Sequence, residues 1–111
     1  MKRYGQVIKI KKEKIEFYKE LHANCWPDVL KKIRECNIRN FSLYLYDDYL
    51  FSYYEYIGDN YNEDIAKMAA DERTQEWWKE TDPCQLPLNP KVITRSDGEW
   101  WSLMDEIFHT D

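Results

Sequence analysis

Two alternating segments in the middle of the chain constrain its fold most strongly. Residues 38–46 and 49–56 both alternate in side-chain character, and the pair Asp47-Asp48 separates them. Two such segments joined by so short a turn predict an antiparallel β-hairpin. The first segment carries Phe41, Leu43 and Leu45 on one face and Ser42, Tyr44 and Tyr46 on the other. Because both faces of the hairpin hold large apolar or aromatic side chains, we expect both faces of the sheet to be covered.

The segments before the hairpin predict a strand and a broken helix. Residues 4–10 alternate, which is typical of a strand. The next side chains recur at spacings of three and four, the period of one helical face: Ile15, Tyr18, His22 and Cys25. Pro27 interrupts this helix because proline lacks an amide donor and disfavours a helical residue before it. A second helical segment starts there, and its predicted apolar face is Val29, Leu30, Ile33 and Cys36.

The segments after the hairpin predict a further helix and a final strand. Residues 62–70 have helical spacing, with Ile65, Met68 and Ala69 facing inward. Residues 71–74 predict a short break that caps another helical turn. Residues 82–97 hold three prolines and no clear period, and a long connection of this kind often serves as a lid. Residues 99–108 predict the last strand.

The order strand, helix, strand, strand, helix, strand predicts an α+β fold of ferredoxin-like βαββαβ topology. The length suits one hydrophobic core, so we expect a single domain over residues 1–111. Helices on one face leave the other face of the sheet bare. A second copy of the chain, forming a dimeric α/β barrel, or a ligand held between sheet and loops would cover it.

Composition argues against several classes of function. The net charge of −5 provides no basic surface for nucleic acid and favours a small neutral or cationic ligand. Three widely spaced cysteines and no apolar leader predict a cytoplasmic protein without a disulfide framework. No apolar run has membrane-spanning length, and three separated glycines offer no phosphate-binding loop.

His22 is the first candidate for chemistry. It follows Tyr18 by four residues, so the two side chains share one helical face just before the break at Pro27. Histidine exchanges protons near neutral pH, because its unperturbed pKa is about 6.5. The competing interpretation is a core histidine that hydrogen-bonds to the backbone, as is usual for a histidine in a helix.

The adjacent pair Trp77-Trp78 is the second candidate. Neighbours on a helix diverge by more than a quarter turn, so the two indoles cannot bury on one stripe. A structural interpretation places one indole in the core and the other at an interface. The functional interpretation is an aromatic wall for a sugar, because the C–H face of a pyranose stacks on an indole.

The remaining reactive side chains predict neither a metal centre nor an acid pair. No CxxC or HxxxH spacing is present, and His22-x-x-Cys25 alone is a weak match to a zinc site. The cysteines are predicted to be small buried side chains: Cys25, Cys36 and Cys84. The acidic residues between positions 59 and 72 are predicted to be solvated charges, Asp59, Glu63, Asp64, Asp71 and Glu72.

Four groups of residues spread over nearly the whole chain are more specific together than any one of them is alone. They are Tyr18-x-x-x-His22-x-x-x-Trp26-Pro27, Ile38-Arg-Asn40-Phe41-Ser-Leu-Tyr44-Leu45, Thr74-Gln75-x-Trp77-Trp78 and Glu106-Ile107-Phe108-His109. This set resembles the L-rhamnose mutarotase family. The resemblance implies a homodimeric α/β barrel, and an isomerase of the racemase and epimerase class that interconverts α and β anomers of a monosaccharide without a cofactor or metal.

The resemblance also implies roles for individual residues. His22 is the implied proton donor, and Tyr18 with the Trp77-Trp78 pair is implied to bind the sugar. A tyrosine normally contacts the sugar from the second strand, and the matching residue here is Phe41, which has no hydroxyl to offer. Mutarotation is therefore the expected activity, while L-rhamnose, L-fucose and other deoxyhexoses are all candidate substrates.

Three other interpretations stay open from the sequence. A non-catalytic sugar-binding protein on the same fold would bind sugar without accelerating anomer exchange. An oxygenase or haem-handling enzyme is another, because ferredoxin-like dimers host many chemistries, and His22 would then be an axial ligand. In a purely structural dimer, the shared face of Tyr18 and His22 would be an accident of packing.

Overall fold

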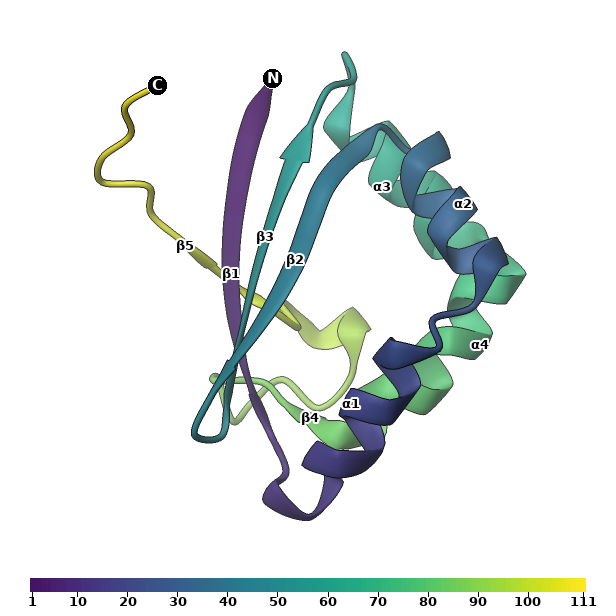
Figure 1. The fold of residues 1–111 in the computed structure, drawn as a ribbon, viewed down its shortest axis with the longest axis vertical. Coiled ribbons are helices and arrows are strands. Elements are labelled where there is room, and N and C mark those ends of the chain that lie inside the picture. Colours follow the sequence, from purple (N-terminus) through teal and green to yellow (C-terminus); the bar gives the residue numbers. More distant parts are fainter.

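The chain folds as one antiparallel sheet with helices on one side in the computed structural model, which describes residues 1–111 (Figure 1). The strands are β1 (Lys2–Ile10), β2 (Ile38–Tyr46), β3 (Tyr49–Tyr56), β4 (Gln85–Leu86) and β5 (Ser102–Met104). Their order is β2-β3-β1-β4, and β5 also pairs with β1. This order is that of the ferredoxin-like fold, so the predicted fold class is confirmed.

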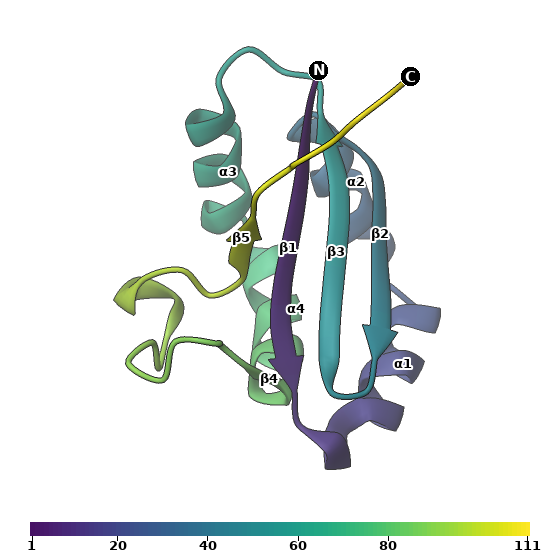
Figure 2. The same cartoon turned by 90° about the vertical axis from the view of Figure 1, so that its left-hand side faces the viewer.

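Four helices lie against the inner face of the sheet. They are α1 (Ile15–Ala23), α2 (Pro27–Glu35), α3 (Tyr61–Ala70) and α4 (Glu72–Thr81). Short 3-10 turns η1 (Lys12–Lys14), η2 (Asp82–Cys84) and η3 (Arg95–Asp97) lie in the connections. Figure 2 looks onto the opposite, outer face, which no helix covers. None of the helices combines the length and the apolar character needed to cross a membrane.

The predicted last strand is the main error in the sequence-based topology. Instead of a strand over residues 99–108, only Ser102–Met104 pair with β1, opposite Gly5–Val7. The far end of the same edge is occupied by β4, opposite Lys9 and Ile10. Because β1 is nine residues long, its edge accommodates two short strands with the irregular segment 87–101 between them.

A bulge in β2 decides which side chains reach the interior. The β2–β3 register shifts between Arg39 and Ser42, and Asn40 adopts a φ of 52°, a conformation that asparagine tolerates well. The extra residue changes the phase of alternation, so Ile38 and Phe41 both face inward despite their odd spacing. The sequence predicts one shared face for Phe41, Leu43 and Leu45, and Phe41 and Leu43 both line the interior.

The core consists of two clusters on the inner face. One contains Ile8, Ile10, Tyr18, Leu50 and Cys84, and the other contains Tyr4, Ile38, Tyr54 and Tyr56. Several predicted inward side chains lie elsewhere, since Leu30 and Ala69 are exposed and Cys25 is only half-buried. The prediction that Asp64 is a solvated charge is also wrong. Its carboxylate is buried, and it accepts hydrogen bonds from the Tyr56 hydroxyl and the Asn37 amide.

Candidate active site

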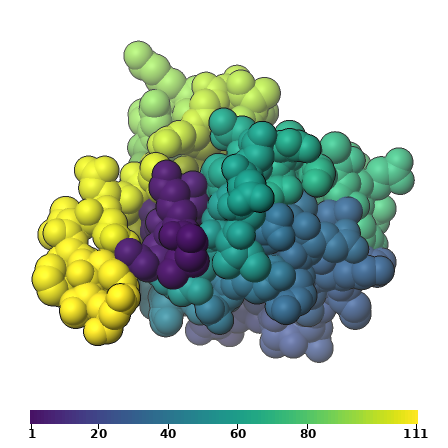
Figure 3. Space-filling model, turned by 90° about the horizontal axis from the view of Figure 1, so that it is seen from above, coloured from purple at the N-terminus to yellow at the C-terminus, as the bar shows by residue number.

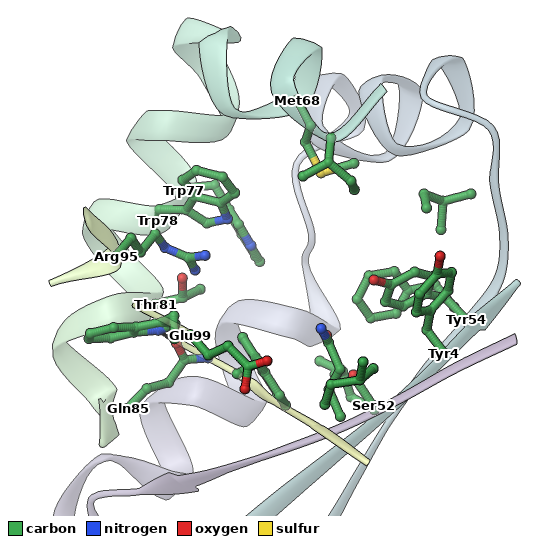
Figure 4. Close-up of a pocket in the computed structure, with 18 of the residues that line it drawn as sticks. Tyr4, Ser52, Tyr54, Met68, Trp77, Trp78, Thr81, Gln85, Arg95 and Glu99 are labelled. Carbon is green, nitrogen blue, oxygen red and sulfur yellow. Dashed lines mark hydrogen bonds between the residues drawn. The ribbon is translucent and has the colours of Figure 1, made fainter. Parts of the chain in front are cut away.

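A cavity of about 490 Å³ lies between the inner face of the sheet and the helices (Figure 4). That volume falls in the range of small-molecule sites, roughly 300–1,000 Å³. Its walls come from strands, helices and the late connection: Tyr4, Gln6, Tyr18, His22, Ile38, Phe41, Leu43, Ser52, Tyr54, Tyr61, Ile65, Met68, Trp77, Trp78, Thr81, Gln85, Arg95, Gly98, Glu99, Trp100, Trp101 and Leu103. All five predicted site residues, Tyr18, His22, Phe41, Trp77 and Trp78, line this cavity.

The imidazole of His22 has one nitrogen engaged and one free. Its Nδ1 lies 2.9 Å from the backbone carbonyl oxygen of Tyr18. A carbonyl can only accept a hydrogen bond, so Nδ1 carries the hydrogen and donates it. In the neutral ring, Nε2 is therefore the basic nitrogen. Burial lowers the pKa of His22 below its usual 6.5, and the bond to the Tyr18 carbonyl opposes this only in part.

The ring of His22 is held between two aromatic side chains. The Tyr18 ring lies 4.3 Å from it, centre to centre, at 35°, and the Trp77 ring lies 5.2 Å away at 74°. Trp26 does not line the cavity but packs against Trp77 from behind, with ring centres 5.1 Å apart. The break between α1 and α2 thus places Trp26 as support for the wall.

Tyr18 presents a protonated hydroxyl. The hydroxyl accepts a hydrogen bond of 2.9 Å from Nε2 of Gln85. Burial raises the pKa of Tyr18 to about 12, against the lowering effect of that hydrogen bond. The phenol therefore keeps its proton at neutral pH, and because its oxygen accepts from Gln85, the proton is free for a ligand.

Trp77 and Trp78 form the wall opposite the sheet. Figure 4 shows both indoles on the α4 side of the cavity, facing Tyr4 and Tyr54 across it. Trp77 is buried against His22, whereas Trp78 is half-buried and lies under Arg95, whose guanidinium carbon is 3.9 Å from the ring centre. Both indoles line the cavity, although they are neighbours in the sequence and leave the helix in different directions.

The late connection closes one side of the cavity. Arg95 is fixed by two hydrogen bonds to Asp82, of 2.9 Å from Nε and 2.8 Å from Nη2. Its guanidinium also lies 5.7 Å from the Trp100 ring, so it bridges the two indoles. Glu99, on the same connection, extends its carboxylate into the cavity (Figure 4). Residues 82–97 are thus next to the cavity, and their movement as a lid stays a prediction.

Phe41 contributes only an apolar surface. Its ring lies 5.4 Å from that of Tyr54 at 30°, and it lines the cavity from β2. The position that the resemblance assigns to a sugar-binding tyrosine therefore does face the cavity, but without a hydroxyl.

Sequence reasoning missed several lining residues with polar side chains: Gln6, Ser52, Gln85, Arg95 and Glu99. Gln6 and Ser52 are single polar residues within strands, and no local pattern distinguishes them. The tryptophan pair Trp100-Trp101 next to Glu99 was the signal that could have pointed to the late connection. No group of three or more His, Cys, Asp or Glu side chains is placed to hold a metal ion.

Comparison with known proteins gives consistent results over the whole length. The family model for L-rhamnose mutarotase matches residues 3–110. The L-rhamnose mutarotase of Bacillus subtilis is 33% identical, and the match covers all of both chains. That of Oceanobacillus iheyensis is 29% identical, again over all of both chains. The crystal structure of an L-rhamnose mutarotase from Formosa agariphila superposes with a TM-score of 0.78 at 18% identity, covering all of both chains.

The last similarity concerns the fold alone, whereas the family match and the curated relatives bear on activity. Together with an aromatic cavity that holds an imidazole and a phenol, they define a sugar mutarotase. The chain belongs to the L-rhamnose mutarotase family.

Proposed function

We propose that this chain is an isomerase that interconverts the α and β anomers of L-rhamnose or a related deoxyhexose, with His22 as the proton-transfer group. The observation that supports this most directly is that only one of the two ring nitrogens of His22 has a hydrogen-bond partner. Its Nδ1 is engaged by the Tyr18 carbonyl, and its Nε2 is the only ring nitrogen left for a ligand in the cavity.

The chemistry follows from the ring hemiacetal. Opening removes the proton of the anomeric hydroxyl, breaks the bond between C1 and the ring oxygen, and delivers a proton to that oxygen. The open-chain aldehyde rotates about C1–C2, and closure on the other carbonyl face returns both protons to their donors. Neither step changes an oxidation state, so the reaction needs only proton transfer and positioning.

Neutral His22 accounts for one of the two protons. A lowered pKa keeps the ring neutral near pH 7, so Nε2 accepts the proton of the anomeric hydroxyl and returns it on closure. The Tyr18 hydroxyl, which is protonated at neutral pH, or a water molecule donates the other proton to the ring oxygen and takes it back on closure. Each positioned proton transfer contributes on the order of 10²–10⁴-fold.

The aromatic walls would orient the sugar. In our proposal the C–H face of the pyranose stacks on Trp77 and Trp78, and Phe41 contacts the opposite side of the sugar. Because Phe41 offers no hydrogen bond, it leaves the choice between L-rhamnose and other deoxyhexoses to other groups in the cavity.

We also propose that the chain acts as a cytoplasmic homodimer of a single domain. Tyr44 is 63% exposed on the outer face of the sheet, and near the C-terminus Ile107 and Phe108 are 94% and 79% exposed. Figure 3 shows the C-terminal residues, in yellow, as a projection beside β1 on the side away from the helices. A second copy packed on this face would cover both apolar surfaces.

Anomer exchange measured by saturation-transfer NMR on a panel of pyranoses tests the activity. We expect His22→Ala to slow exchange by about 10²–10⁴-fold, because the transferring imidazole is gone. Sugar binding and circular dichroism should change little. The matched control is His109→Ala, which removes the chain's other histidine from the exposed C-terminal segment. Sugar binding without accelerated exchange by the natural chain would instead favour the non-catalytic alternative.

A further inference from the structure

Two polar side chains, Ser52 and Gln6, lie on the sheet side of the cavity. Ser52 on β3 and Gln6 on β1 are direct partners across the sheet, and both side chains face inward. Ser52 is only 4% exposed, yet its Oγ is the one buried side-chain polar atom without a hydrogen-bond partner. Figure 4 shows Ser52 on the sheet side of the cavity, across from the indoles of α4.

The surroundings make this pair conspicuous. The other lining side chains of β1, β2 and β3 are apolar or aromatic: Tyr4, Ile38, Phe41, Leu43 and Tyr54. A buried hydroxyl without a partner destabilises the folded state, and proteins seldom keep one unless it serves a ligand or an ordered water. An alanine at this position would satisfy the packing and carry no such penalty.

We propose that Ser52 and Gln6 form a hydroxyl-binding subsite that helps to select the sugar, in place of the phenol absent at Phe41. A serine hydroxyl and a carboxamide can each donate and accept, which matches the hydroxyl groups of a pyranose. Their positions on adjacent strands, side by side on one face, suit two neighbouring hydroxyls of the ring. This inference rests on the proposed function, because it takes the ligand to be a monosaccharide.

Specificity of this kind has a characteristic pattern. A site built to hydrogen-bond a hydroxyl discriminates against an analogue that lacks it, because the protein groups are then left unpaired. Removing the protein group should abolish that discrimination for the same hydroxyl only. Sugar and protein can therefore be altered in a cycle that isolates the contact.

The experiment measures dissociation constants of L-rhamnose and its 2-, 3- and 4-deoxy analogues by titration calorimetry. We expect the natural chain to bind at least one analogue about 3- to 10-fold more weakly than L-rhamnose, the effect of one lost hydrogen bond. Ser52→Ala should bind L-rhamnose more weakly by a similar factor and no longer distinguish that analogue. Gln6→Met, similar in shape without the amide, provides a second variant should Ser52→Ala fold poorly.

Stability separates a ligand-binding role from a structural one. Without sugar, Ser52→Ala should melt at the same or a higher temperature, because it removes an unpaired buried hydroxyl. Ser42→Ala is the matched control, because Ser42 lies on the outer face of the same hairpin. This variant should bind every sugar as the natural chain does. A melting temperature lowered by Ser52→Ala would point to a structural hydrogen bond and overturn the subsite.

The outcomes distinguish this inference from the function it rests on. If the natural chain accelerates anomer exchange but both variants bind all four sugars unchanged, the subsite is wrong and the mutarotase proposal stands. If the variants lose the discrimination but no exchange is accelerated, the subsite stands and the catalytic proposal is wrong. Absence of any binding to these sugars by the natural chain overturns the subsite.

Discussion

Gln85 links the two sides of the cavity through one amide. Its Oε1 accepts a hydrogen bond of 2.8 Å from Nε1 of Trp100, and its Nε2 donates to the Tyr18 hydroxyl. Because an indole nitrogen can only donate, the bond to Trp100 fixes which end of the amide faces Tyr18. The orientation of Gln85 thus leaves the Tyr18 proton available to a ligand.

Gln85→Glu tests this positioning role. A carboxylate can accept from both Trp100 and Tyr18, so the phenol proton would point to residue 85 and away from a sugar. We expect slower anomer exchange with folding retained. Gln85→Leu loses both bonds and should lower the free energy of unfolding by about 1–3 kcal/mol, because buried groups are left unpaired. Exchange NMR and urea unfolding measure the two effects, and an unaltered exchange rate in Gln85→Glu would exclude the role.

The proton-transfer proposal predicts a pH profile. Exchange should fall as pH drops through the pKa of His22, which burial places below 6.5, because Nε2 is then protonated. Tyr18 should cause no loss until strongly alkaline pH, since its pKa is raised to about 12. Rates of exchange measured across this range provide the check, and a rate that rises in acid would contradict a basic imidazole.

The same shift predicts a stability effect. The unfolded chain binds a proton at His22 as pH falls below about 6.5, whereas the folded chain binds it only at lower pH. Folding stability should therefore decrease as pH falls between the two pKa values. In His22→Gln the melting temperature should depend less on pH in that interval than it does in the natural chain.

At the scale of elements, local geometry decides what each segment contributes to the cavity. Pro27 separates α1 from α2, and the break puts Trp26 behind Trp77. The bulge at Asn40 turns Phe41 inward, and the irregular connection after β4 brings Arg95 against Trp78. Each of these irregular points lies beside the cavity, where a regular helix or strand would have pointed other side chains inward.

The contact between Asp82 and Arg95 should hold the late connection against the cavity. In Asp82→Asn the guanidinium loses its carboxylate partner, so Arg95 is less firmly held over Trp78. We expect a higher KM with a smaller change in kcat, and faster cleavage within residues 87–101 by a protease. Glu76→Gln, an exposed change on α4, is the charge-matched control. Cleavage and KM equal to those of the natural chain would show that the contact does not hold the connection.

At the scale of the whole molecule, the two faces of the sheet have different coverings. Four helices cover the inner face, and the cavity lies between them and the strands. The outer face and the C-terminal segment expose aromatic and aliphatic side chains. An apolar surface of this kind is typical of a protein with a partner, which is the physical basis for the proposed homodimer.

Tyr44→Glu tests the proposed interface. A charge placed on the outer face would be desolvated between two sheets. We therefore expect the dimer of the variant to dissociate at a higher protein concentration than the dimer of the natural chain. Sedimentation velocity measures the change. The control is Ala66→Glu, which adds the same charge to an exposed position of α3. A natural chain that sediments as a monomer at all concentrations would contradict the proposed dimer.

The sequence by itself determined the features that depend on neighbouring residues. Helical periodicity put Tyr18 and His22 on one face, alternation defined the three long strands, and Pro27 set the break between two helices. These follow from backbone geometry within a few residues, and their order was enough to give the ferredoxin-like class.

Only the tertiary structure decided which distant groups complete the cavity. The partner of Tyr18 is Gln85, 67 residues later, and Ser52 faces Gln6 because β1 and β3 pair in one particular register. The edge of β1 pairs with two short strands, β4 and β5, and the connection between them is held by contacts such as that of Arg95 with Asp82. Such contacts depend on packing and register across the molecule, and no local pattern in the sequence encodes them.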